Sequence, residues 1–119
     1  MKKICVLLAV IVLALVIAAC LIGKGTLITS QESPNGDYTV HLYQIGSPGW
    51  PFGAVSAKLV LENSEGDTID KVTFDLANDG GGVYEGNIEE IHWLQENVEI
   101  IMGEADTTKQ YIYILYYDQ

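Results

Sequence analysis

Two histidines are the side chains of this sequence best suited to proton transfer. His41 and His92 each fall in a segment whose apolar and polar residues alternate as in a β-strand. A serine hydrolase would also carry a local nucleophile signature such as G-x-S-x-G, which the sequence lacks. We therefore expect both histidines to be strand residues that face solvent, and no catalytic residue is predicted.

Two adjacent acids could in principle act on a glycosidic bond. Glu89 and Glu90 lie in a predicted strand, where successive side chains point to opposite faces of the sheet. A glycosidase needs both of its carboxyl groups on one substrate. The pair therefore favours a chain that is not an enzyme.

Oxygen donors also gather around a triple glycine, Gly80-Gly81-Gly82, where a flexible loop could suit Ca²⁺. The spacing departs from the D-x-[DN]-x-[DN]-G pattern of a calcium loop. We expect a solvated acidic loop that holds no metal and no cofactor, while cation sensing stays an alternative. The donors are Asp75, Asn78, Asp79, Glu85, Asn87 and Glu89.

Two large aromatic residues, Trp50 and Phe52, are the candidate binding residues of the sequence. They lie in the segment GSPGWPFG, which Pro48 and Pro51 stiffen. Rigid aromatic side chains on a loop make good anchors for a partner. The same rings could instead fold back and cap the open end of a sheet, and the sequence leaves both possibilities open.

An uninterrupted apolar run from Ile4 to Ile22 precedes all of these residues. It contains no charge, glycine or proline, and it has the roughly 20 residues that a helix needs to cross a bilayer. A segment in lipid must satisfy its backbone internally, so the run is predicted to be helical. Lys2 and Lys3 before it favour a cytoplasmic N-terminus. We therefore expect a location at the cell membrane, with the bulk of the chain on the extracytoplasmic side.

The end of the apolar run resembles the lipobox of bacterial lipoproteins. Ile17-Ala18-Ala19-Cys20 has an aliphatic residue and two small residues before a cysteine. The resemblance implies that Cys20 would be lipidated after cleavage. Leu21 and Ile22 continue the apolar run, which departs from the pattern. Residues 1–23 are therefore either a transmembrane anchor or a lipoprotein signal peptide.

Charge and cysteine content restrict what the remaining residues can bind. After residue 23, four lysines face all sixteen acidic residues, and there is no arginine. Nucleic-acid binding depends on basic side chains that neutralise phosphates, so we expect no nucleic-acid partner. Both cysteines lie in the apolar run, so the following domain has no disulfide and depends on packing.

The remaining sequence predicts an all-β domain behind a short link. Residues 24–32 are polar and are predicted to be a tether, and residues 33–119 form the extracytoplasmic β domain. Short strands joined by turns favour a single small antiparallel sheet or sandwich, a blade-like meander of about six strands. The last strand has apolar residues on both faces, which predicts a central position. The predicted strands are 38–45, 54–62, 69–76, 88–94, 98–102 and 111–117.

The turn Ser33-Pro34-Asn35-Gly36-Asp37-Tyr38 resembles the turn of TolB-like and WD40-like propeller blades. The segment from Trp93 to Ile100 resembles a degenerate copy of this unit. A propeller needs at least four blades of about 40 residues, so the resemblance implies only a blade-like meander. With its anchor and loops, the chain also resembles small membrane-anchored bacterial domains of unknown function, which implies no activity and no catalytic residues.

These observations predict a membrane-tethered, extracytoplasmic interaction or accessory domain that is not catalytic. Its expected partners are the membrane, through the N-terminal segment, and another membrane or envelope protein. A ligand- or cation-sensing envelope module is the alternative from a different class, and a hydrolase ranks third.

Overall fold

The structure is a computed structural model that describes residues 2–48, 53–105 and 108–118, without the side chains of residues 2 and 16–24. It contains one N-terminal helix followed by seven strands and a single turn of 3₁₀-helix. The elements are α1 (Lys2–Lys24), β1 (Thr26–Glu32), β2 (Tyr38–Ile45), β3 (Val55–Asn63), β4 (Thr68–Leu76), η1 (Glu85–Asn87), β5 (Ile88–Trp93), β6 (Asn97–Gly103) and β7 (Gln110–Tyr116).

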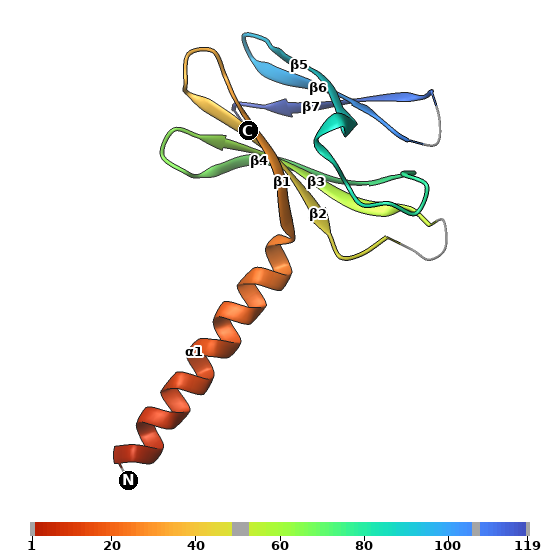
Figure 1. Ribbon diagram of the computed structural model, residues 1–119. Helices are drawn as coiled ribbons and strands as arrows, with labels where there is room; N and C mark the ends of the chain where they lie inside the picture. The colour runs from red at the N-terminus through yellow and green to blue at the C-terminus, as the bar shows by residue number, and fades with distance from the viewer. Residues whose placement is uncertain (1, 49–52, 106–107, 119) are drawn as a thin grey trace.

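The strands form two antiparallel sheets that pack as the layers of a sandwich (Figure 1). One sheet has the order β1-β2-β3-β4 and the other the order β5-β6-β7. Every strand pairs with its neighbour in sequence, so each sheet is a meander. The predicted all-β antiparallel architecture is confirmed, as two sheets.

The core lies between the sheets and follows the predicted alternation. In β3, Val55, Ala57, Leu59 and Leu61 are fully buried and face inward. The opposite sheet supplies the other half of the core through Val98, Ile100, Met102 and Leu115. Side chains of a strand repeat every two residues, so alternate residues lie on one face and the sequence predicts this pattern.

The predicted tether at residues 24–32 is wrong, because Thr26–Glu32 is strand β1. This segment pairs with β2 along its length, with a bulge between Leu27 and Thr29. Its side chains are largely exposed because β1 is an edge strand. The polar residues of this segment correctly indicated that it is exposed to solvent. An edge strand and a linker are both exposed, so composition alone does not distinguish them.

The predicted central position of the last strand is also wrong. Strand β7 lies at the edge of the three-stranded sheet. Its inward residues Tyr113 and Leu115 pack in the core, whereas Ile112 is 61% exposed and Ile114 is 43% exposed on the outer face. The apolar residues on the outer face had predicted that another element would pack against that face. No element in the described part of the chain does so.

Helix α1 leaves the sandwich as a separate rod (Figure 1). Its large apolar side chains between Ile4 and Leu15 are 47% to 65% exposed. Among the described residues, no helical stretch reaches the length and hydropathy that crossing a bilayer requires.

Gly25 joins the helix to β1 with a positive φ of 74°. A Cβ at this position would collide with the carbonyl oxygen of Gln44 in β2. Only glycine fits this junction without strain, since it tolerates positive φ and has no side chain.

Candidate binding site

An aromatic cleft of about 360 Å³ opens at the end of the sandwich that faces away from α1. Strand β1 runs from the helix toward this end (Figure 1), and the turn after Glu32 supplies lining residues of the cleft. None of the lining residues is an Asp, Glu, Lys or Arg, although the domain is strongly acidic. The lining residues are Ser33, Pro34, Asn35, Tyr38, Trp93, Leu94, Gln95 and Tyr117.

One wall of the cleft is the turn between β1 and β2. The Gly36 amide donates to the Ser33 carbonyl over 2.9 Å, and Gly36 has a positive φ of 78°. The buried Ser33 hydroxyl donates to Asn35 Oδ1 and accepts from the Tyr38 amide, at 2.7 and 3.1 Å. These bonds hold the turn in one conformation, so Pro34 and Asn35 are presented rigidly to the cleft.

Two stacked tyrosines line the cleft, Tyr38 in β2 and Tyr117 directly after β7. The rings of Tyr38 and Tyr117 lie 4.3 Å apart with an interplanar angle of 15°. The Tyr117 hydroxyl donates to the carbonyl of Leu94 over 2.9 Å. Burial raises the pKa of Tyr117 above its usual value of 10.0, and the nearby Tyr38 adds to the shift. The pair therefore connects β2 of one sheet with the chain that follows β7 of the other, beside the cleft.

The opposite wall is the end of β5 and the turn that follows. Trp93 faces inward opposite Val98 and packs against the core, and the Leu94 amide donates to the Asn97 carbonyl over 2.9 Å. Leu94 is 45% exposed at the rim of the cleft. Aromatic walls with a few amide groups suit binding of an apolar group, because rings offer large rigid surfaces.

Both walls come from segments whose residues predicted turns, Ser33–Tyr38 and Gln95–Asn97. The Ser33–Tyr38 turn supplies one side, and the segment beginning at Trp93 supplies the other. The sequence contained this signal, but the cleft itself was not predicted. The missing information was that two turns about 60 residues apart lie at the same end of the sandwich.

The predicted binding residues Trp50 and Phe52 lie outside the described residues, as does the side chain of Cys20. Their roles remain predictions. The strand ends that flank the Trp50 segment, in β2 and β3, lie at the end of the sandwich from which α1 emerges (Figure 1). The aromatic cleft is at the other end.

His41 forms a hydrogen-bonded row on the outer face of the four-stranded sheet. Ser30 Oγ lies 2.6 Å from His41 Nδ1, and Glu62 Oε2 lies 3.3 Å from His41 Nε2. This serine, histidine and acid come from three neighbouring strands and do not line the aromatic cleft. His92 faces solvent on the other sheet, 2.9 Å from Glu90 Oε2.

The predicted solvated loop is partly wrong, because two of its members are buried in an amide clasp. Asn78 Nδ2 donates to Asn87 Oδ1 over 2.9 Å, and Asn87 Nδ2 donates back to Asn78 Oδ1 over 3.0 Å. Asn87 also bonds the Tyr84 amide and the Gly103 carbonyl. Ala105 N donates to Asn78 Oδ1. These contacts occupy the amides with each other and with the backbone, so they fix loops rather than hold a cation.

The remaining acids of this region point in different directions. Asp75 accepts a hydrogen bond from Ser56 on the outer face of the four-stranded sheet, and Asp79 is exposed. Across the described ranges, no three His, Cys, Asp or Glu side chains form a group that could hold a metal ion.

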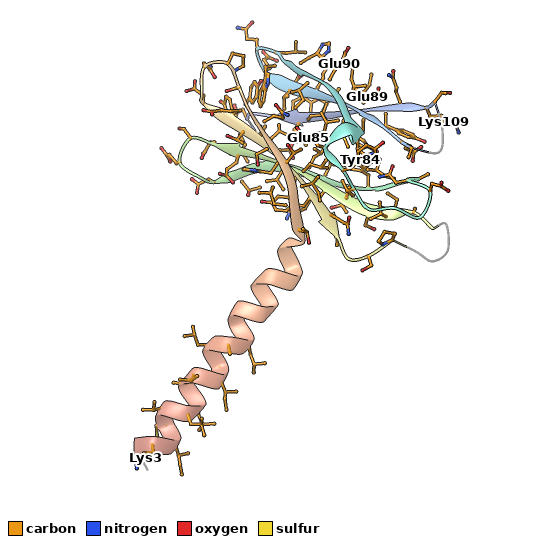
Figure 2. All side chains as sticks on the ribbon, in the orientation of Figure 1. Lys3, Tyr84, Glu85, Glu89, Glu90 and Lys109 are labelled. Atoms are coloured by element: carbon orange, nitrogen blue, oxygen red, sulfur yellow. The ribbon has the colours of Figure 1, made fainter. Side chains whose placement is uncertain are left out.

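The expectation that Glu89 and Glu90 point to opposite faces is wrong. A bulge interrupts the β5–β6 register between Ile88 and Glu90, and a bulge breaks the alternation of side chains. Both residues line one polar pocket of about 290 Å³ at the edge of β5, while the Glu89 carboxylate accepts from Gln110 Nε2 and the Glu90 carboxylate lies beside His92 Nε2. Figure 2 shows the two residues along this strand, above Tyr84 and Glu85 of η1.

Comparison with protein-family models, curated proteins and solved structures finds no match for this chain.

Proposed function

We propose that this chain is a tethered, non-catalytic interaction domain that binds a partner through the aromatic cleft. The observation that carries the proposal is the uncharged cleft of about 360 Å³ between Pro34, Tyr38, Trp93 and Tyr117. Rigid rings lose little conformational freedom on binding, so such a surface favours association. Its position at the end of the domain away from α1 would present it to a partner rather than to the tether.

The tether is proposed to be the membrane segment, with the β domain on the extracytoplasmic side. The proposal rests on the uncharged run from Ile4 to Ile22, on the preceding lysines, and on exposed apolar side chains along α1. Exposed leucine, valine and isoleucine on every face of a helix are costly in water and favourable in lipid.

Protease accessibility tests this topology. Protease added to intact, wall-stripped cells should remove the β domain and leave a membrane-bound fragment that ends near Lys24. Full protection in intact cells, with digestion only after lysis, would contradict an extracytoplasmic domain.

The alternative anchor is a lipid on Cys20. A Cys20→Ala variant of a lipoprotein would lose incorporated lipid label and accumulate as precursor. An unlabelled parent and a variant of unchanged size and membrane retention would instead identify an uncleaved helix. Cys5→Ala is the matched control, since it removes the other cysteine of the same run.

The binding role of the cleft is tested by photo-crosslinking in membranes. A photoreactive amino acid at Gln95, on the cleft, should give a discrete crosslinked product, whereas one at Asp75, exposed on β4 toward the other end of the sandwich, should not. Leu94→Asp should abolish the product, and Leu27→Asp serves as control because Leu27 is similarly exposed outside the cleft. Equal products at both positions, or none, would contradict the proposal.

A hydrolase is the second candidate, favoured only by the Ser30–His41–Glu62 row. Acyl transfer also needs donors placed to stabilise an oxyanion and a site to hold the acyl group, and this row lies outside both pockets. We expect p-nitrophenyl acetate hydrolysis by the parent and by Ser30→Ala to be equal. A loss of rate in Ser30→Ala, with Ser64→Ala unaffected, would establish the hydrolase instead.

A further inference from the structure

The two long sides of the sandwich differ. Along one side, β4 and β7 are drawn together: the Tyr116 amide donates to Asp70 Oδ2 over 2.9 Å, and the rings of Phe74 and Tyr113 stack at 4.2 Å. Along the other side lie the edge strands β1 and β5. Within the described strands, β1 pairs only with β2 and β5 only with β6. The open side therefore has two strand edges with one unpaired side each.

A groove made of two adjoining pockets follows this open side. The polar pocket at β5 is lined by Gln31 of β1 together with Ile88, Glu89, Glu90, Ile91 and Trp93 of β5. Trp93 also lines the aromatic cleft, so the two cavities share this residue. Six strand residues span about 20 Å, at 3.3–3.4 Å each. The groove is therefore long enough for a segment of about six extended residues.

The groove changes character along its length. Its far end, the aromatic cleft, contains no Asp, Glu, Lys or Arg. At its other end Glu89 and Glu90 line the polar pocket, without a Lys or Arg among its lining residues. The Glu89 carboxylate accepts from Gln110 Nε2. The Glu90 carboxylate lies 2.9 Å from His92 Nε2, so these contacts of the two acids are with an uncharged amide and a histidine. An apolar end and a negative end about 10–13 Å apart, three to four strand residues, define a ligand with two different groups.

We propose that the groove binds an extended basic peptide segment of a partner protein. A proline or other apolar residue of the segment occupies the aromatic cleft, and a lysine or arginine lies beside Glu89 and Glu90. This assignment rests on the proposed function and specifies the partner's chemistry. An extended peptide can add to a strand edge through its main chain, while pockets select its side chains. The paired carboxylates supply the charge complementarity.

The structure favours a peptide over an oligosaccharide as the occupant. A neutral sugar would use the aromatic rings and the amides of Asn35 and Gln95, and its hydroxyls would donate to the carboxylates, but it would bring no positive charge to them. It would also leave the edge of β5 unpaired. A basic extended segment uses the rings, the charge and the strand edge together.

The test is selection of random decapeptides displayed on phage against the full chain in lipid nanodiscs. Enriched sequences should combine a proline, aromatic or aliphatic residue with a lysine or arginine two to four positions away. Synthetic copies should bind at least tenfold more weakly to Glu89→Gln/Glu90→Gln. They should also weaken with salt. Asp75→Asn/Asp79→Asn is the control, because it removes two exposed acids at the far end of β4 that line neither pocket.

A charge exchange tests the proposal even if Glu89→Gln/Glu90→Gln lowers the stability of the domain. Glu89→Lys/Glu90→Lys should lose the basic peptides and bind the same peptides with glutamate in place of lysine. Far-UV circular dichroism and melting temperature identify any variant that has failed to fold. Restored binding by the exchanged pair cannot come from an unfolded domain.

The other outcomes separate this inference from the proposed function. Peptides that need Leu94 but are indifferent to Glu89 and Glu90 would overturn the inference and leave the binding cleft in place. Binding of neutral oligosaccharides on an array, dependent on Leu94 and without peptide enrichment, would assign a sugar ligand and overturn the inference. Absence of any ligand that depends on Leu94 would overturn both.

Discussion

Replacement of Asn87 should be among the most destabilising single changes in the β domain. Asn87 is fully buried, and its amide makes four hydrogen bonds: two with Asn78, one from the Tyr84 amide and one to the Gly103 carbonyl. These bonds join the loop after β4, the turn η1 and the end of β6. Asn87→Ala removes the side-chain amide to which all three segments are hydrogen-bonded.

The magnitude follows from the partners that remain. Gly103 and Asn78 are buried, and each buried polar group that loses its partner costs about 1–3 kcal/mol. Asn78 keeps the Gly82 carbonyl and the Ala105 amide, which limits its share. We expect a loss of about 2–4 kcal/mol. A domain of this size has about 5–14 kcal/mol in total, so the loss is a large fraction of its stability.

Urea unfolding followed by tryptophan fluorescence measures this loss, because both tryptophans lie in the β domain and neither lies in α1. Asn63→Ala is the matched control, since Asn63 also accepts two backbone hydrogen bonds, but in an exposed turn. The double variant Asn78→Ala/Asn87→Ala should cost less than the sum of the single changes, because the first change already removes the shared bonds. An Asn87→Ala loss no larger than that of Asn63→Ala would refute the reasoning.

Three further changes test other contacts. Asn97→Val should leave stability unchanged or raise it, because Asn97 Oδ1 is buried without a hydrogen-bond partner in the described structure. Urea unfolding should therefore show no loss of stability in this variant. Gly25→Ala should cost more than Gly46→Ala in the same assay: both have positive φ, but only at Gly25 would a Cβ meet a backbone oxygen, that of Gln44. The parent should lose stability as pH rises through and above 10, because Tyr117 has a raised pKa when folded. Its stabilising effect is complete below the unfolded pKa and is lost as pH rises through the folded one. Tyr117→Phe should flatten that decline in unfolding measured between pH 9 and 12, and an equally steep decline in the variant would contradict the assignment.

The sequence by itself determined the helix, the all-β class and most of the inward faces. The buried set Val55, Ala57, Leu59 and Leu61 follows from a period of two, which is a local property. The turn from Ser33 to Tyr38 was equally local, because proline, asparagine and glycine set its backbone angles.

Only the tertiary structure decided which strands lie at the edges and which distant turns meet. Thr26–Glu32 was mistaken for a tether and the last strand for a central one, because edge position depends on neighbours that a sequence pattern does not specify. The bulge that brings Glu89 and Glu90 to one pocket is a feature of strand pairing, not of composition. The cleft exists because two sheets place the turn after β1 and the end of β5 side by side. Local alternation fixes which face of a strand is apolar, but packing alone decides what that face meets.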